Sequence, residues 1–149
     1  EIAVRALSPG INDSVTAMDC IDQLGYILMK LSDGFDSLVY KDEEDVPRLK
    51  LSTISFEKLL YNHFYQIYLY GHKDLKVLAA MIKALTRISS DSDSYMKNAI
   101  WNFFLYLVKD IDAKNMHQYD FKLIHEEVRE LAYKCHKQKA YKELMDSIK

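Results

Sequence analysis

The stretch EIAVRALSPGINDSVTA, residues 1–17, determines the predicted secondary structure of the N-terminal part of the chain. The apolar residues that precede Pro9 are typical of a short helix. This helix is predicted to end within the two residues before Pro9, because a proline disfavours helical geometry in the residue preceding it. Asp13 then stands at the N-cap of a second helix, where its side-chain oxygen would accept a backbone hydrogen bond, and Asn12 is the alternative cap. The stretch predicts a helical stub, a tight corner and a longer helix.

The composition is that of a folded domain with long regular elements. A chain of 149 residues suits one domain, residues 1–149, which buries roughly 70% of its unfolded surface. Hydrophobic residues make up 49% of the chain, and it contains only four glycines and two prolines. These proportions favour helices over a loop-rich fold, and the charged fraction of 28% argues against disorder throughout the chain.

The charges are unevenly distributed. The net charge of −2 gives no electrostatic reason to expect a nucleic acid partner. Residues 1–60 carry 11 acidic and 6 basic side chains, whereas residues 61–149 carry 11 acidic and 14 basic side chains. The lysines of the last twenty residues indicate a solvated helix face, and contact with an anionic membrane surface is the alternative.

Neither the cysteines nor the apolar runs point to a secreted or membrane-spanning chain. Cys20 and Cys135 form no CxxC pair, so a reducing compartment is expected. The most apolar run, residues 99–108, is shorter than the ~20 residues of a membrane span and contains Asn102. The chain has no signal peptide and begins inside a motif, so we expect it to be part of a longer protein.

Periodicity predicts a mainly helical bundle of about five helices plus the N-terminal stub. The second helix is expected from Asp13 to about Leu31, followed by a stop at residues 32–34. Alternating residues near 36–52 predict a short β-hairpin insertion. Its four acidic tip residues, 42–45, lack the spacing of a calcium loop, so we expect a solvated tip.

The C-terminal two thirds of the chain predict further helices. Ser55 and Gly71 are expected to cap a helix that forms an antiparallel pair with the next one, from Asp74 to about Ile88. A helix over 95–110 is apolar around its circumference, which indicates either the central helix of the bundle or a face that meets another subunit. A single last helix is predicted over 120–148.

The corner of residues 5–13 is the candidate functional site. It is expected to bring together a guanidinium, a hydroxyl, an amide and a carboxylate, from Arg5, Ser8, Asn12 and Asp13. The free N–H groups of the following helix could hold a phosphate or carboxylate ligand beside them. In the structural alternative, Asp13 caps the helix, Arg5 pairs with a carboxylate or with carbonyls of the last turn, and the proline–glycine pair fixes the corner.

The remaining titratable residues predict neither a metal site nor a nucleophile. The five histidines include no pair at the i, i+4 spacing of a helical metal site, and His125-Glu126-Glu127 lacks the second histidine of HExxH. Cys135 and His136 are adjacent, so on a helix they point about 100° apart and cannot act together. We therefore expect no metal and no cofactor.

The same N-terminal stretch resembles the DIALRALSPGINDPFTA signature of a bacterial family of predicted membrane proteins, domain-of-unknown-function family 2254. The resemblance continues through CIDQL at 20–24, SFE at 55–57 and QIYLYG at 66–71. Ser14 departs from the proline that family members usually carry there, which weakens the helix-start signal. The resemblance implies transmembrane helices upstream of this segment, with the present domain at the cytoplasmic face of the cell membrane.

The sequence as a whole predicts a soluble helical domain of an integral membrane protein. We expect it to work through protein contacts, with its own transmembrane region and with further copies of itself as a homo-oligomer. The alternative is a ligand-binding or enzymatic domain with an anion site at the Arg5–Asp13 corner.

Overall fold

The computed structural model describes residues 1–31, 38–51, 54–109, 111 and 116–148. Within these ranges the chain forms seven helices and one antiparallel pair of strands. In chain order the elements are α1 (Ile2–Ala6), α2 (Ser14–Leu31), β1 (Leu38–Lys41), β2 (Pro47–Leu51), α3 (Phe56–Gly71), α4 (Leu75–Ser89), α5 (Ser94–Val108), α6 (Gln118–Lys134) and α7 (Gln138–Ile148). The predicted helical bundle with a β-hairpin is confirmed.

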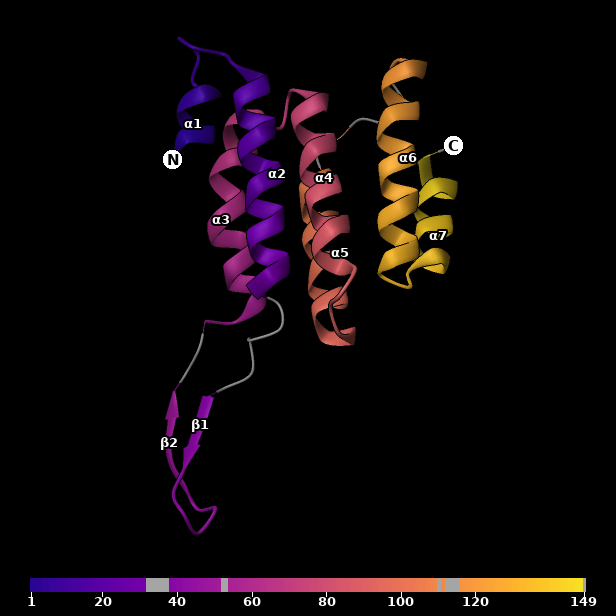
Figure 1. The fold of residues 1–149 in the computed structure, drawn as a ribbon. Helices are drawn as coiled ribbons and strands as arrows, with labels where there is room; N and C mark the ends of the chain where they lie inside the picture. The colour runs from indigo at the N-terminus through magenta and orange to yellow at the C-terminus, as the bar shows by residue number, and fades with distance from the viewer. Residues whose placement is uncertain (32–37, 52–53, 110, 112–115, 149) are drawn as a thin grey trace.

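The helices lie in two layers. Figure 1 shows α2, α4 and α6 side by side in one layer, with α3 and α5 behind them and α7 packed on α6. The chain alternates between the layers, so α3 and α4 run antiparallel as predicted, although α4 packs mainly on α2 and α6. The short α1 lies against α2 and α3 at one edge of the array.

The centre of the array is α4. Ten of its 15 residues are buried, because it contacts α2 and α6 within its layer and α3 and α5 behind it. The apolar helix α5 is buried on more than one side, against α3, α4 and α6. The expectation that α5 is the central helix is wrong, since that position belongs to α4.

Two glycines allow helices to approach closely. A Cβ added at Gly25 of α2 would lie 2.9 Å from the Cβ and 3.2 Å from the Cα of Ala84 in α4. A Cβ at Gly71 would lie 2.6 Å from Val77 Cγ1 and 3.0 Å from Leu7 Cδ1. Gly71 is the last residue of α3 rather than the predicted C-cap, which is His72, and no described glycine has a positive φ. Its role is close packing and not a left-handed turn.

The β-hairpin extends away from the helices (Figure 1). Its register pairs Leu38 with Leu51 and Tyr40 with Leu49, and an irregularity follows Tyr40. The strands lie within the predicted 36–52 segment. The predicted stop of the second helix at 32–34 lies outside the described residues.

The predicted single helix over 120–148 is wrong, because the chain breaks between α6 and α7. His136 adopts a left-handed φ of 57°. The Lys137 N–H donates to the Ala132 carbonyl at 2.8 Å and the His136 N–H donates to the Tyr133 carbonyl at 3.2 Å. This is the hydrogen-bond pattern of a Schellman motif, which ends a helix and usually has glycine where His136 stands. The missing glycine is why the sequence pattern did not show the break.

Replacing Gly25 with alanine is expected to lower the free energy of unfolding by about 1–2 kcal/mol. The added methyl group must displace the backbone of α4, which costs more than the gain in helix propensity of about 1 kcal/mol. Gly10→Ala is the control, because nothing lies within 4 Å of a Cβ at that position. Urea unfolding followed by circular dichroism measures both variants, and equal stabilities would contradict the close packing of α2 on α4.

Candidate functional site

Backbone hydrogen bonds close the corner between α1 and α2. The Ser8 carbonyl accepts from the N–H groups of Ile11 at 3.0 Å and Asn12 at 2.9 Å. The Asp13 N–H donates to the Ala6 carbonyl at 2.8 Å, and Asn12 adopts a left-handed φ of 49°. The corner therefore holds Ser8, Asn12 and Asp13 together as one tight turn.

Asp13 is the N-cap of α2, as predicted. Its Oδ1 accepts from the Thr16 backbone N–H at 3.0 Å and its Oδ2 accepts from the Thr16 hydroxyl at 2.6 Å. These two hydrogen bonds lower the pKa of the Asp13 carboxyl below its ordinary value. The N-terminus of α2 is thus already capped by the Asp13 carboxylate of the same chain.

The structure does not join Arg5 to Asp13. The Arg5 side chain is exposed on α1, and neither an ion pair nor a side-chain hydrogen bond links it to any of the described residues. Only its backbone carbonyl takes part in the turn, accepting from the Ser8 N–H at 3.1 Å. Among the described residues, the guanidinium therefore has no side-chain partner.

Ser14 and Asp74 connect the starts of two helices. The Ser14 hydroxyl donates to Asp74 Oδ2 at 2.5 Å, and Asp74 Oδ1 accepts from the Lys76 N–H at 2.9 Å as the N-cap of α4. Burial alone would raise the pKa of Asp74, but the hydrogen bonds from Ser14, Lys76 and Val77 outweigh it and lower the pKa. The pairing spans 60 residues of sequence, so no local pattern revealed it.

Asp74→Ala is expected to lower the free energy of unfolding by about 1 kcal/mol at neutral pH, because α4 loses its N-cap. Since folding lowers the pKa of Asp74, its stabilisation is present above the ordinary pKa of 3.8 and is lost as the pH falls through the folded-state pKa. The variant and the wild-type protein should therefore converge in acid. Asp74→Asn keeps the cap without the charge and should lose less, and thermal unfolding across pH 2–7 compares all three.

A groove runs between α1, α2 and α3. Its volume is about 770 Å³, and its apolar lining comes from all three helices (Ile2, Val4, Leu24, Ile27 and Ile67). Ile2 is 68% exposed and Ile27 is 53% exposed, so both present large apolar surfaces to solvent. The same groove contains polar groups, including Asp19 and His63.

One charged side chain of the groove, Asp19, and the exposed Arg5 of α1 have no ion-pair partner among the described residues. Asp19 is exposed on α2 and takes part in no ion pair with a described residue. Arg5 lies one helical turn from Ile2 on α1 and is exposed, but it is not among the residues that line the groove. The His63 ring donates from Nδ1 to the Leu59 carbonyl at 2.8 Å, which fixes its orientation. An apolar groove that contains a carboxylate without an ion pair among the described residues is suited to protein contact.

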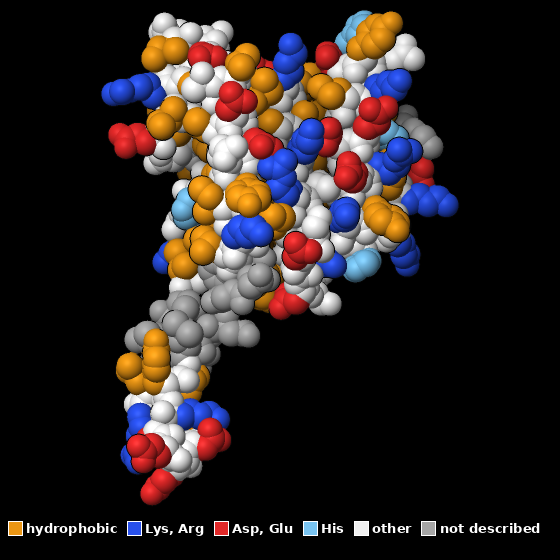
Figure 2. Space-filling model, viewed as in Figure 1, with side chains coloured by type: hydrophobic (Ala, Val, Ile, Leu, Met, Phe, Trp, Pro, Cys, Tyr) orange, Lys and Arg blue, Asp and Glu red, His pale blue; other side chains and the backbone are white. Residues whose placement is uncertain are grey.

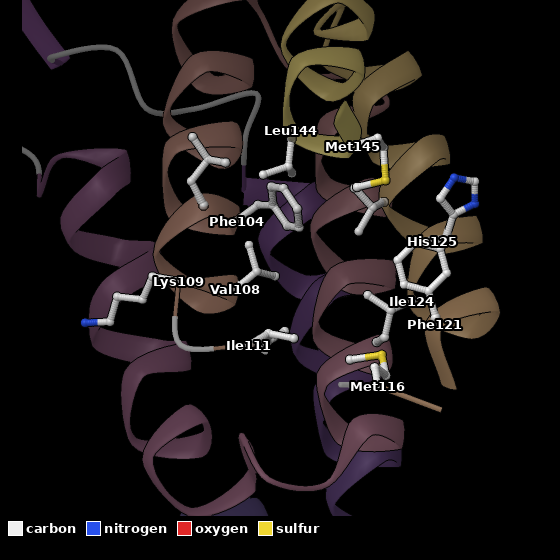
Figure 3. Close-up of a pocket in the computed structure, with 12 residues that line it drawn as sticks. Phe104, Val108, Lys109, Ile111, Met116, Phe121, Ile124, His125, Leu144 and Met145 are labelled. Carbon is white, nitrogen blue, oxygen red and sulfur yellow. The ribbon is translucent and has the colours of Figure 1, made fainter. Parts of the chain in front are cut away.

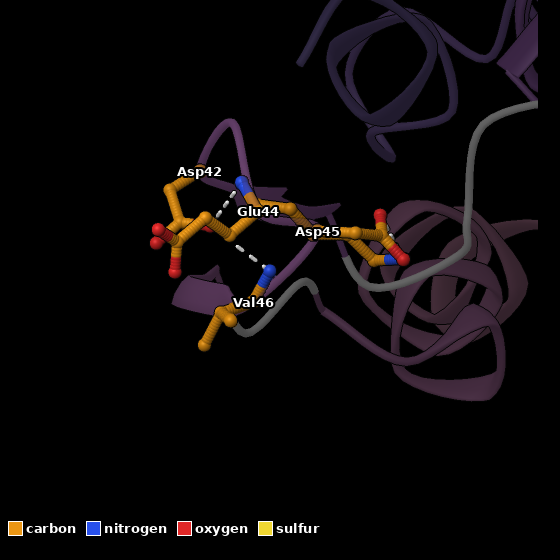
Figure 4. Close-up of polar contacts among 5 residues, drawn as sticks. Asp42, Glu44, Asp45 and Val46 are labelled. Atoms are coloured by element: carbon orange, nitrogen blue, oxygen red, sulfur yellow. Dashed lines mark hydrogen bonds and ion pairs between the residues drawn. The ribbon is translucent and has the colours of Figure 1, made fainter.

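The hairpin tip is held by its own charges. Asp42 Oδ1 accepts from the N–H groups of Glu44 and Val46, both at 3.0 Å (Figure 4), and Asp42 Oδ2 pairs with Arg48 Nε at 2.6 Å. These bonds, the one from Val46 above all, lower the pKa of Asp42. Lys41 pairs with Asp45 at 2.8 Å, and Figure 2 shows acidic and basic side chains gathered at the tip. The acidic run is therefore engaged in building the turn.

The described residues offer little to metal or thiol chemistry. They contain no group of three histidine, cysteine or acidic side chains that could hold a metal ion. Burial raises the pKa of the Cys135 thiol to about 11, so it stays protonated at neutral pH and is a poor nucleophile.

The comparisons with known proteins add one finding. A family model described as "Predicted membrane protein (DUF2254)" matches residues 1–87, which is more than half of the chain and reaches from α1 almost to the end of α4. No curated protein and no solved structure gives a significant match. Among the described helices, none has both the length and the apolar character needed to cross a bilayer.

Proposed function

The chain belongs to the DUF2254 family of predicted membrane proteins, and we propose that it forms a contact domain that pairs with a second copy of itself. The observation that carries this proposal is the apolar groove between α1, α2 and α3. A membrane protein of this kind would use the domain to assemble beside the membrane rather than to catalyse a reaction.

The place of the groove in the fold supports an interface. Within its layer α4 has a helix on both sides, whereas α2 has α4 on one side and only the five-residue α1 near the other. Along this edge, beside α3, Ile27 of α2 stays 53% exposed and Leu24 is only partly buried. A further helix packed there would bury the apolar side chains that α2 and α3 expose, which is the usual source of affinity at an interface.

A two-fold arrangement satisfies the unpaired charges. In an isologous dimer each copy gives the same surface, so α1 of one copy would lie in the groove of the other and the reverse. Ile2 would then enter an apolar groove, and Arg5 would stand opposite Asp19 of the second copy. The pairing thus explains why one short helix carries an exposed isoleucine and an exposed arginine side by side.

The cysteines support the cytoplasmic side of the membrane as the location of the domain. Both are free thiols, Cys20 half-buried in the groove and Cys135 buried in the core. Free, unpaired cysteines are typical of reducing compartments.

Self-association is tested by sedimentation velocity at several protein concentrations. The wild-type chain is expected to shift from monomer to dimer as its concentration rises. Ile27→Asp should weaken the dimer about ten-fold or more, because it places a charge in the apolar part of the interface. A species that stays monomeric at every concentration would contradict the proposal.

Charge reversal at Arg5 and Asp19 tests the proposed dimer interface more specifically. Arg5→Glu and Asp19→Arg should each weaken dimerisation, and the double variant should restore it, since the opposite charges then face each other again. Leu69→Asp is the matched control for Ile27→Asp, because Leu69 is 48% exposed on α3 but does not line the groove. If the charge-reversal variants dimerise as strongly as the wild-type chain, the interface lies elsewhere on the surface.

An anion site at the Arg5–Asp13 corner is the second proposal, and the unpaired guanidinium of Arg5 is the observation that favours it. Because the Asp13 carboxylate already caps α2, an anion would bind beside Arg5 and Asn12 rather than at the helix end. Asn12 also lines a shallow hollow, in which the charges of Lys73 and Lys76 stand beside the carboxylates of Asp74 and Asp120.

Inorganic phosphate is the probe for this second proposal. Titration followed by amide chemical shifts is expected to show saturable changes at residues 5–13, and Arg5→Gln should abolish them. Lys30→Gln removes an exposed cation at the far end of α2 and should change nothing. Absence of saturation in the wild-type protein would rule out the anion site. The sedimentation test of dimerisation does not depend on this outcome.

A further inference from the structure

A cavity of about 260 Å³ lies between α5, α6 and α7 (Figure 3). Its walls are apolar on all three sides, with Phe104 and Val108 from α5, Ile124 and Val128 from α6, and Leu144 and Met145 from α7. The cavity stands at the opposite edge of the helical array from the groove, beyond the region that the family model matches.

The polar groups at the margin of the cavity are engaged elsewhere. The Lys109 side chain points away from the cavity in Figure 3, and its ammonium lies 4.4 Å from the centre of the Tyr106 ring. His125 Nε2 is hydrogen-bonded to the Tyr141 hydroxyl at 2.6 Å. A buried water needs two to four polar partners, and the described side chains that line the space are apolar apart from Lys109 and His125. The cavity is therefore poorly suited to water and to charged groups.

We infer that this cavity is a binding site for a small neutral apolar molecule, of the size of one or two aromatic rings or a short alkyl chain. A dry apolar cavity of about 150 Å³ is already large enough to bind benzene, and this one is larger. An anionic ligand such as a fatty acid fits poorly, because none of the described residues turns a cation toward the interior.

Two flexible side chains allow the cavity to adapt to the shape of a ligand, while a hydrogen bond between α6 and α7 holds the helices in place. Met116 and Met145 line the cavity, and their unbranched thioether side chains adapt to irregular shapes. The hydrogen bond between His125 and Tyr141 ties α7 to α6 and so holds the third wall in place. A bound ligand would fill the space between α5 and α7 and stabilise the seating of the last helix.

Toluene is the probe for this site, measured by thermal unfolding and by methyl chemical shifts. Toluene at about ten times its Kd is expected to raise the Tm by roughly 3–5 °C, with saturable shifts at cavity methyl groups. Heptanoate has similar size but carries a charge, and it should bind at least ten-fold more weakly.

Filling the cavity provides the control. Val108→Phe and Leu144→Phe, introduced from α5 and α7, should each weaken toluene binding ten-fold or more while the circular dichroism of the helices is retained. Val15→Phe places the same side chain at a position that is 65% exposed on α2 and should leave binding unchanged. Toluene binding that fails to saturate, that survives both filling variants, or that is weaker than heptanoate binding would overturn the inference.

Discussion

The close approach of α2 and α4 is the contact on which the rest of this fold depends. It requires the absence of a side chain at Gly25, because the Cβ and Cα of Ala84 occupy the space that a Cβ would need. Two polar pairs accompany it: Ser14 with Asp74 at the starts of both helices, and Asp22 with Arg87 at 2.7 Å farther along. The two helices are thereby fixed in position and in register along their length.

This contact determines where the two candidate sites lie. Once α4 is enclosed between α2 and α6, α2 becomes an edge helix whose outer side is covered only by the short α1. The apolar groove is the consequence. The family match ends at Arg87, so the matched region contains both partners of the α2–α4 contact and all of the groove. The helices α5 to α7 add the other edge and the cavity between them.

Much of the fold could be read from the sequence where local hydrogen bonds decide the structure. Asp13 and Ser55 cap their helices through N–H groups three residues later, and Asp74 does so through the N–H two residues later, all within the reach of a sequence pattern. The hairpin follows from alternation and a polar tip. The break at His136 does not show in the sequence because its left-handed residue is not a glycine. The sequence pattern also does not reveal the role of Gly71, because close packing and helix capping favour the same residue.

The candidate sites were less predictable, because they depend on contacts between distant segments. The corner residues were identified by their neighbourhood in sequence, but the structure separates the Arg5 guanidinium from the Asp13 carboxylate. Conversely, Asp19 and Ile27 belong to a candidate site only because α1 and α3 leave a groove beside them, which no sequence pattern shows. A helical periodicity shows which face of α2 is apolar, but it does not show whether a neighbour covers that face.

The two-layer arrangement also separates the groove from the cavity. They share no lining residue, and the buried helix α4 lies between the edges at which they stand (Figure 1). Substitutions at distant sites without common partners have nearly additive effects. Self-association at the α1–α2–α3 edge and ligand binding between α5, α6 and α7 are therefore expected to respond to separate sets of substitutions, so that a ligand could occupy one edge while the other pairs with a second copy.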